Sequence, residues 1–420
     1  MNCTAIICEY NPFHNGHKYL IEEARRISGS NYIIAVMSGN YMQRGGPAVT
    51  DKWTRARIAI ECGADAVIEI PSVFSSGSAQ FFAEAAVDLI NKTGVVDYIA
   101  FGSETADIDR LKTFGETRAK EPEKFREILK SMLKDGNSYS TAMEKALGTR
   151  LKSNDILAVE YISALYKTNS AVTPVIIKRA GSAEHTDSVL PSKKTESGSS
   201  SASSDSSASF ASASALRKIL SQHEEYTNCN SKAYNFMPEN ASALLRKALT
   251  AQGGSMSLEN FSQIIFYELR RLKPEGIRAL PYVSEGFEYK LYEAACKTGD
   301  IDSLTDFCTS SRYTKTRVTR ILTAILTGAT AKSHEAWRNN LPYIKILGFK
   351  RSSAELISVI SEKAHVPVII QPAKAMKTLS ESAKLLLGLE YFATDNYVLG
   401  FGNSSMQNAG QEFTRKSVII

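Results

Sequence analysis

Apolar and polar positions along the first 180 residues predict strands and helices in turn. Short apolar runs predict buried strands, at Cys3–Cys8, Tyr32–Met37, Ala66–Ile70, Tyr98–Phe101 and Val172–Lys178. Apolar residues spaced three or four positions apart predict helices between them, at His17–Ile27, Asp51–Cys62, Ser78–Ile90 and Asp155–Tyr166. Because the strands are apolar throughout and alternate with helices, we expect an α/β domain with a parallel sheet covered on both faces.

The pattern changes after about Asn240, where no alternation of strands and helices is evident. Helical spacing continues, at Leu258–Leu272, Gly286–Thr298, Thr314–Leu326 and Ser352–Glu362. We therefore expect a Rossmann-like catalytic domain over residues 1–225 and a mainly α-helical domain over residues 240–420.

Serine dominates the segment between Gly181 and Ser209, and branched apolar and aromatic residues almost vanish from it. Such a composition cannot bury enough apolar surface to offset the entropy lost on ordering. We expect a flexible surface loop at about 182–209. It is either a passive linker or a lid that orders when a ligand binds.

Composition narrows the class of protein. Of the 420 residues, 43% are hydrophobic and 22% are charged, as in ordinary globular proteins. No apolar run approaches the length of a membrane span, and no signal peptide is visible, so we expect a cytoplasmic protein without a membrane partner. Six scattered cysteines without a C-x-x-C pair favour reduced thiols. The net charge of +6 weakly favours a polyanionic partner.

The motif P-F-H-N-G-H, residues 12–17, follows the first predicted strand and opens the first predicted helix. A helix N-terminus offers free N–H groups to a phosphate, and Gly16 allows the backbone to approach closely. Side chains three positions apart lie on the same side of a helix, so His14 and His17 can point at one phosphate.

Two other interpretations of this histidine pair remain open. The imidazoles could cap the helix or lie on a solvated surface. They could also ligate a metal, but no carboxylate stands at suitable helical spacing after His17, so we predict no metal site.

A second possible phosphate element lies at Ser212–Arg217, S-A-S-A-L-R, where a helical pattern resumes. The Ser214 hydroxyl and free N–H groups would face phosphate oxygens, and Arg217 would supply charged donors. An ordinary helix cap followed by a surface arginine is the alternative.

Together these two elements resemble the HIGH superfamily of nucleotidyltransferases and class I aminoacyl-tRNA synthetases. The resemblance implies that His14 and His17 are catalytic residues, which bind ATP phosphates and stabilise the transition state of adenylyl transfer. It also implies that the serine-rich turn is the second phosphate-binding element.

Further motifs occur in a fixed order: EYNPFHNGH, SGNYMQRGGPAVTDKWTRA, GADAVIEIP, FGSE and SNDILAVEYI, then weaker matches at EGFEYKL, SRYTKTRVTR and YIKILGF. In this combination the chain is similar to the bacterial tRNA(Met) cytidine acetate ligase family. The resemblance implies a ligase that activates acetate with ATP and releases pyrophosphate. The acetyl-adenylate would then acetylate N4 of the wobble cytidine in elongator tRNA(Met).

The resemblance also implies an ATP site. Its residues would be Ile7, Cys8, Glu9, Tyr10, Asn11, Pro12, Phe13, His14, Asn15, Gly16, His17, Lys18, Tyr19, Leu20, Gly102, Asn154, Arg179, Ser214 and Arg217. A glycine at position 102 would let a flat nucleotide approach. Without the family, Asn154 reads as a helix cap and Arg179 as a surface charge. We expect Mg²⁺ to arrive with ATP, although the sequence shows no recognisable set of protein ligands for it.

Two more segments have candidate roles. The loop Ser38–Gly46 follows the second strand and could hold the acyl-adenylate or the incoming cytidine. The alternative is a loop that only connects a strand to a helix. In the helical part, Arg312, Lys315, Arg317 and Arg320 surround Tyr313, which suits an RNA backbone with one stacked base. A charged helix can equally be a solvated face, and Ser311-Arg312 replaces the lysine–arginine pair expected for the family.

Two alternative functions remain open. One is an adenylyltransferase that makes a small cofactor, which would need no large basic helical domain. The other is a tRNA-binding protein whose ATP site only regulates and which forms no acetyl-adenylate.

Overall fold

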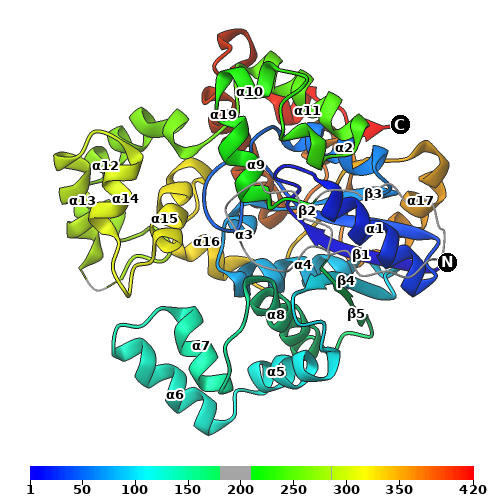
Figure 1. Cartoon of the computed structure of the whole chain (residues 1–420), viewed down its shortest axis with the longest axis horizontal. Coiled ribbons are helices and arrows are strands. Elements are labelled where there is room, and N and C mark those ends of the chain that lie inside the picture. The colour runs from blue at the N-terminus through cyan, green and yellow to red at the C-terminus, as the bar shows by residue number, and fades with distance from the viewer. Residues whose placement is uncertain (180–209, 285) are drawn as a thin grey trace, which may run out of the picture.

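The computed structural model describes residues 1–179, 210–284 and 286–420, so the serine-rich loop predicted at 182–209 lies outside the described residues. An eight-stranded sheet in the order β5-β4-β1-β2-β3-β6-β7, with β8 beside β6, forms the centre of this part of the chain (Figure 1). The five predicted strands are all present and mutually parallel: β1 (Cys3–Cys8), β2 (Tyr32–Ser38), β3 (Ala66–Ile70), β4 (Tyr98–Ser103) and β5 (Thr173–Lys178).

Helices cover both faces of the sheet because alternate side chains of each strand point to opposite faces. On β1, Ile6 and Cys8 pack with one group of helices and Ala5 and Ile7 with the other. The first group includes α1 (Asn15–Ser28), α2 (Lys52–Glu61), α9 (Ala213–Leu220), α10 (His223–Thr227) and α11 (Glu239–Gln252). The second includes α3 (Ser72–Ser75), α4 (Ala79–Thr93) and α8 (Ser153–Lys167) together with helices of the C-terminal part.

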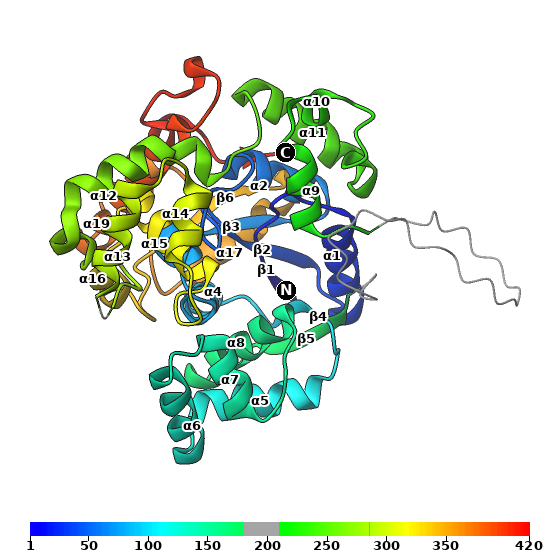
Figure 2. The same ribbon diagram turned by 60° about the vertical axis from the view of Figure 1, so that its left-hand side comes forward.

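Two groups of helices extend from this layered body, and both views separate them (Figures 1 and 2). One is inserted between β4 and α8 and consists of α5 (Ile108–Lys120), α6 (Glu123–Lys134) and α7 (Tyr139–Leu147). The other consists of α12 (Ser262–Ile277), α13 (Phe287–Lys297), α14 (Ile301–Cys308), α15 (Lys315–Thr327) and α16 (Ala331–Ala336). The predicted helices of the C-terminal part are thus confirmed.

The C-terminal part, which the pattern predicts to be mainly helical, also contributes three short strands among its described residues. β6 (Ile344–Phe349) joins the sheet antiparallel to β3, and β7 (Val368–Ile369) and β8 (Val418–Ile419) pair with β6. The signal was weak because Lys345 interrupts the apolar run of β6, and the other two strands are two residues long. The α/β fold with a helical C-terminal part is confirmed, whereas the boundary between residues 225 and 240 stays a prediction.

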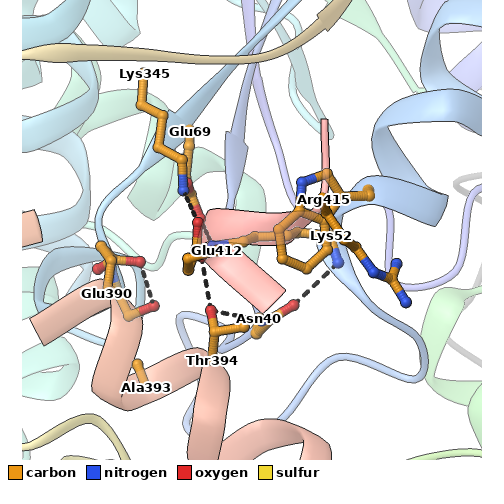
Figure 3. A network of polar contacts seen from close by, with 12 residues as sticks. Asn40, Lys52, Glu69, Lys345, Glu390, Ala393, Thr394, Glu412 and Arg415 are labelled. Carbon is orange, nitrogen blue, oxygen red and sulfur yellow. Dashed lines mark hydrogen bonds and ion pairs between the residues drawn. The ribbon is translucent and has the colours of Figure 1, made fainter. Parts of the chain in front are cut away.

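The C-terminal residues return to the sheet through α17 (Ala354–Lys363), α18 (Pro372–Ala375), α19 (Glu381–Leu399) and α20 (Gln411–Thr414). Four charged side chains are buried together where they meet it (Figure 3). Glu69 on β3 lies 2.6 Å from Lys52 on α2 and 2.7 Å from Lys345 on β6, and both lysines also pair with Glu412 on α20. Two cations and two carboxylates balance, which matters because an unpaired buried charge is costly.

The pKa shifts in this charge quartet agree with its pairing. Burial alone opposes ionisation of Glu412, but Lys345 and Lys52 outweigh burial and lower the pKa of that carboxyl to about 2. Burial likewise opposes a charged Lys345, yet Glu412 and Glu69 raise its pKa. Glu412 and Lys345 are therefore both charged at neutral pH.

The charge quartet is connected to the loop after β2. The Thr394 hydroxyl on α19 donates to Glu412 over 2.7 Å and accepts a hydrogen bond from the Asn40 amide over 3.2 Å (Figure 3). The side-chain oxygen of Asn40, Oδ1, in turn accepts from the backbone N–H of Lys52 over 3.0 Å. The C-terminal helices therefore fix the start of the Ser38–Gly46 loop.

We expect Lys345→Met to lower the free energy of unfolding by about 3–5 kcal/mol, because it leaves an uncompensated buried carboxylate. The double variant Lys345→Met/Glu412→Gln keeps one cation with one carboxylate and should recover more than half of that loss. Urea denaturation measures both. The pairing would be contradicted if the double variant lost as much stability as the single variants Lys345→Met and Glu412→Gln lose together.

Glu390 on α19 makes stability depend on pH. Burial and then Glu69 raise the pKa of this carboxyl from 4.5 to about 7, against the opposite effect of Lys52 and Lys345. The raised pKa means that its stabilising contribution is complete below pH 4.5 and is lost as pH rises through about 7.

We expect Glu390→Gln, which still accepts from the Ser72 N–H but cannot ionise, to lose less stability between pH 5 and pH 8 than the native chain. The difference amounts to at most about 3 kcal/mol. Urea titrations at several pH values measure it. Glu381→Gln on the same helix, where the carboxyl is exposed, is the control and should leave the pH profile unchanged.

Candidate active site

The chain turns sharply between β1 and α1, at the carboxyl edge of the sheet. Tyr10 has a left-handed backbone, with φ of 48°, which is strained for a bulky residue. Its ring is buried and lies 4.8 Å from the ring of Phe13. The side chains of Ile7, Cys8, Tyr10 and Phe13 are all buried, so they support the turn from within the core.

The two imidazoles are held by the backbone of this turn. His14 is the N-cap of α1, and its Nδ1 accepts from the Gly16 N–H over 3.1 Å. The Nδ1 of His17 accepts from the His14 N–H over 3.2 Å, and the two rings stack with centroids 3.7 Å apart. Capping and phosphate binding are therefore compatible, because a neutral ring that accepts at Nδ1 carries its proton on Nε2 and can donate there.

Both imidazoles are neutral at physiological pH. Burial lowers the pKa of His14 to about 3, with further lowering from Arg179 and Arg217. Burial, His14 and Arg179 lower the pKa of His17 well below its usual range. The histidines can thus donate hydrogen bonds to an anion, while its charge must be met by the guanidinium groups.

Arg217 and Arg179 are the predicted cations that the structure brings to the histidines. Arg217 on α9 donates to the Asn11 carbonyl oxygen over 2.8 Å, and burial lowers its pKa. Arg179 follows β5, and its aliphatic chain passes Gly102: a Cβ at that glycine would lie 3.2 Å from Arg179 Cγ. Gly102 therefore makes room for Arg179, and its contact with a nucleotide stays a prediction.

The other predicted residues of the first helices lie nearer the surface. Asn15 and Gly16 form the first turn of α1, while Tyr19 and Leu20 are half-buried. Lys18 is exposed and lies 3.8 Å from Glu22. On α9, Ser212 is the N-cap, and Ser214 lies exposed in the first turn.

Asn154 is held beside the end of β4. It lies in the first turn of α8, whose N-cap is Lys152, so the alternative of Asn154 as the cap is wrong. Its amide donates to the Glu104 carboxylate. The buried Asp155 carboxylate accepts from the Glu104 N–H over 3.1 Å and from the Ser103 hydroxyl, which fixes this corner. Sequence reasoning assigned no role to Glu104 and Asp155, although they lie within the motifs FGSE and SNDILAVEYI that it singled out.

The loop Ser38–Gly46 is packed between the sheet edge and α15. The Gln43 N–H donates to the Glu9 carboxylate over 2.6 Å, and the Gly46 N–H donates to Thr323 on α15 over 2.6 Å. A Cβ at Gly45, where φ is 82°, would lie 2.5 Å from the Thr319 carbonyl carbon. Only glycine fits at that position.

Arg55 ties together the ends of β1 and β2. Its buried guanidinium donates to the carbonyl oxygens of Glu9 over 2.8 Å, Ser38 over 3.0 Å and Thr50 over 3.1 Å, and to that of Gly39. A buried cation that satisfies four carbonyls fixes the carboxyl edge. The sequence offered no signal for this role beyond the position of Arg55 in a helix.

The four cations predicted to contact RNA are not brought together on one face. Lys315 is exposed, between Asp302 at 3.5 Å and Asp306 at 3.4 Å. Arg312 is half-buried, and its carbonyl oxygen accepts from Arg317. Arg317 also donates to the Tyr282 carbonyl oxygen over 2.7 Å.

Arg320 and Tyr313 depart furthest from the prediction. The Arg320 guanidinium points to the Ser38–Gly46 loop, donating to the Gln43 carbonyl oxygen over 2.8 Å. Tyr313 is buried, and its ring stacks on Phe287 with centroids 3.6 Å apart. The expectation that Tyr313 stacks on an RNA base is therefore wrong, since its face is already covered.

Within the described ranges, no group of three histidine, cysteine, aspartate or glutamate side chains is placed to hold a metal ion. In the same ranges, no helix combines the length and the apolar character that crossing a bilayer requires.

Comparison with known proteins agrees with this geometry. A family model described as HIGH Nucleotidyl Transferase matches residues 1–412, so the fold and site define a nucleotidyltransferase of the HIGH type. The protein named tRNA(Met) cytidine acetate ligase in Acetivibrio thermocellus is 36% identical over 433 residues, covering all of both chains. Its namesake in Thermoanaerobacter sp. (strain X514) is 35% identical over 98% of each chain. The chain belongs to the tRNA(Met) cytidine acetate ligase family.

Solved structures match over the full length as well. A crystal structure of Thermotoga maritima TmcAL bound with alpha-thio ATP has a TM-score of 0.87 at 28% identity and covers all of both chains. The apo form of the same protein has a TM-score of 0.89 at 29% identity, also over all of both chains.

We expect His14→Ala to lower the free energy of unfolding by about 1–2 kcal/mol, because it removes the cap of α1. His14→Asn retains a capping acceptor and should be clearly more stable than the alanine variant. Thermal or urea unfolding compares them. An alanine variant as stable as the native chain would show that the capping bond contributes nothing.

Proposed function

We propose that the chain is an ATP-dependent acetate ligase that acts on elongator tRNA(Met). It forms acetyl-adenylate and pyrophosphate from acetate and ATP. It then transfers the acetyl group to N4 of the wobble cytidine, giving N4-acetylcytidine in the cytoplasm. Family membership supports this proposal, as does the full-length similarity to a protein whose structure contains an ATP analogue.

The single observation that carries the proposal is the stacked imidazole pair at the start of α1. His14 and His17 each have Nδ1 occupied by a backbone N–H, so their Nε2–H groups are the donors left for a ligand. A neutral donor strengthens its hydrogen bond as negative charge grows on a phosphate oxygen. Arg179 and Arg217 supply the opposing charge, in the two-donor geometry that suits phosphate.

The chemistry proceeds in two balanced steps. An acetate oxygen bonds to the α-phosphorus while the bond from that phosphorus to the pyrophosphate oxygen breaks, and pyrophosphate leaves with the electron pair. The cytidine amine then bonds to the acetyl carbon, the bond from that carbon to the AMP oxygen breaks, and the amine loses one proton to solvent. Positioning and electrostatics are the main contributions expected from the protein in such transfers.

The remaining partners fit in the same proposal. Mg²⁺ would arrive on the ATP phosphates, because the described residues gather no carboxylate set of their own. The helical part of the chain would bind the tRNA, with Lys315 as the predicted contact that lies exposed. Asn154 would contact ATP, and Ser214 would face the terminal phosphates.

We expect His14→Asn/His17→Ala to abolish acetate-dependent ATP–pyrophosphate exchange in a folded protein, a loss of at least about a hundredfold. His14→Ala/His17→Ala should lose the exchange too, at some cost in stability. Incubation of the native chain with labelled acetate, ATP and unmodified elongator tRNA(Met), followed by nucleoside analysis, detects the product.

Three results would contradict the proposal. Undiminished exchange in the double variants would remove the role of the imidazoles. Exchange that acetate does not stimulate would favour a cofactor adenylyltransferase. Binding of ATP and tRNA without any N4-acetylcytidine would leave a regulatory tRNA-binding protein.

A further inference from the structure

Arg320 is a half-buried residue of α15 whose guanidinium contacts no carboxylate among the described residues. It forms no ion pair within 4 Å among the described residues, and its hydrogen bonds go to Gln43: Nε donates to the carbonyl oxygen over 2.8 Å, and Nη2 reaches the side-chain oxygen over 2.8 Å once the amide is oriented to accept. Burial lowers its pKa. Partial loss of hydration makes a guanidinium without a counter-charge less stable, and a bound anion offsets that cost.

Charged and polar neighbours of Arg320 act on it from several elements. Arg44 and Arg317 lower its pKa, while Glu9 and the Tyr282 hydroxyl raise it. Glu9 is already engaged, since its carboxylate accepts from the Gln43 N–H over 2.6 Å. The Arg44 guanidinium donates to the Ser153 hydroxyl rather than to a carboxylate. Among the described residues, the Arg320 and Arg44 guanidinium groups thus face one carboxylate that is already engaged, which suits an anion.

Arg320 lies across the sheet edge from the phosphate-binding elements. α1, which His14 caps, and α9, which carries Arg217, pack on one face of the sheet, whereas α15 lies against α3 and α19 on the side of the other face. Figure 2 shows α1 and α9 on one side of β1 and β2 and α15 on the other side. Glu9, which directly follows β1, lies between these two sides, and its carboxylate accepts a hydrogen bond from the Gln43 N–H.

In-line displacement at phosphorus fits an arrangement in which groups for the leaving pyrophosphate and for the nucleophile lie on opposite sides of the sheet edge. The attacking oxygen and the leaving oxygen lie on opposite sides of the α-phosphorus. If pyrophosphate leaves towards His14, His17 and Arg217, the nucleophile must approach from the side of α15. The nucleophile in the proposed reaction is a carboxylate, and the N–H groups of Arg320 that Gln43 does not use, two on Nη1 and one on Nη2, can donate to its two oxygens.

We propose that Arg320 binds the carboxylate of acetate and directs it at the α-phosphorus, an inference that rests on the proposed function. Arg320 thereby becomes a substrate-binding residue of the adenylation site, where the sequence had predicted an RNA contact. The Gln43 carbonyl and the tight contact of Gly45 with α15 hold the guanidinium in place.

The test separates the acetate and ATP affinities. Arg320→Gln should raise the KM for acetate in ATP–pyrophosphate exchange by about tenfold to a hundredfold, because a charge-assisted bond is lost. The KM for ATP should change less than about threefold. Arg320→Lys keeps the charge without the fork and should fall in between. Arg271→Gln, which removes an exposed guanidinium on α12, is the matched control and should change neither KM.

A binding experiment tests the inference independently of turnover. Saturation-transfer NMR of acetate with the full chain and a non-hydrolysable ATP analogue should show acetate bound to the native chain and not to Arg320→Gln. An unchanged acetate KM, or equal rises for acetate and ATP, would overturn the role of Arg320. If Arg320→Gln fails to fold, the same comparisons with Arg320→Lys decide.

Acetate bound normally by the variant would overturn the inference even if turnover were lost. A native chain that binds acetate through Arg320 but shows no acetate-dependent exchange would instead refute the proposed function. A native chain that neither binds acetate nor shows exchange refutes both.

Discussion

The buried charge quartet is the interaction on which the rest of the structure depends. Charges can be removed from water only when they are paired, and here the partners come from β3, α2, β6 and α20. The pair formed by Lys52 and Glu412 joins residues 360 positions apart in the chain. Through Thr394 and Asn40 the quartet also fixes the loop after β2, so the C-terminal helices take part in shaping the site.

Burial affects the charge of the histidines and of the arginines at the site differently. It removes the charge from His14 and His17, which lets them serve as helix cap and hydrogen-bond donors at once. It does not remove the charge of a guanidinium, so Arg179 and Arg217 must provide the positive potential. Arg55 uses its charge differently, holding the strand ends by their carbonyl oxygens.

Features that depend on neighbours in the sequence could be predicted, and features that depend on distant residues could not. The five parallel strands and the histidine turn arise from local patterns, and their positions were predicted within a few residues. β6 was missed because Lys345 looks misplaced in a buried strand until Glu69 and Glu412 are known to meet it. The position of Arg320 beside Gln43 spans 277 residues, which no local pattern contains.

The cations of α15 show why charge density along a helix does not define a binding face. Each residue advances about 100° around the helix axis, so positions 315 and 317 point about 200° apart, whereas 317 and 320 share a side. Accordingly, Lys315 is exposed, while Arg317 and Arg320 turn inward to the Tyr282 and Gln43 carbonyls. A helix can present cations both to solvent and to the interior only by dividing them between its faces in this way. The direction in which each cation points around the helix axis therefore matters more than the number of cations in the helix.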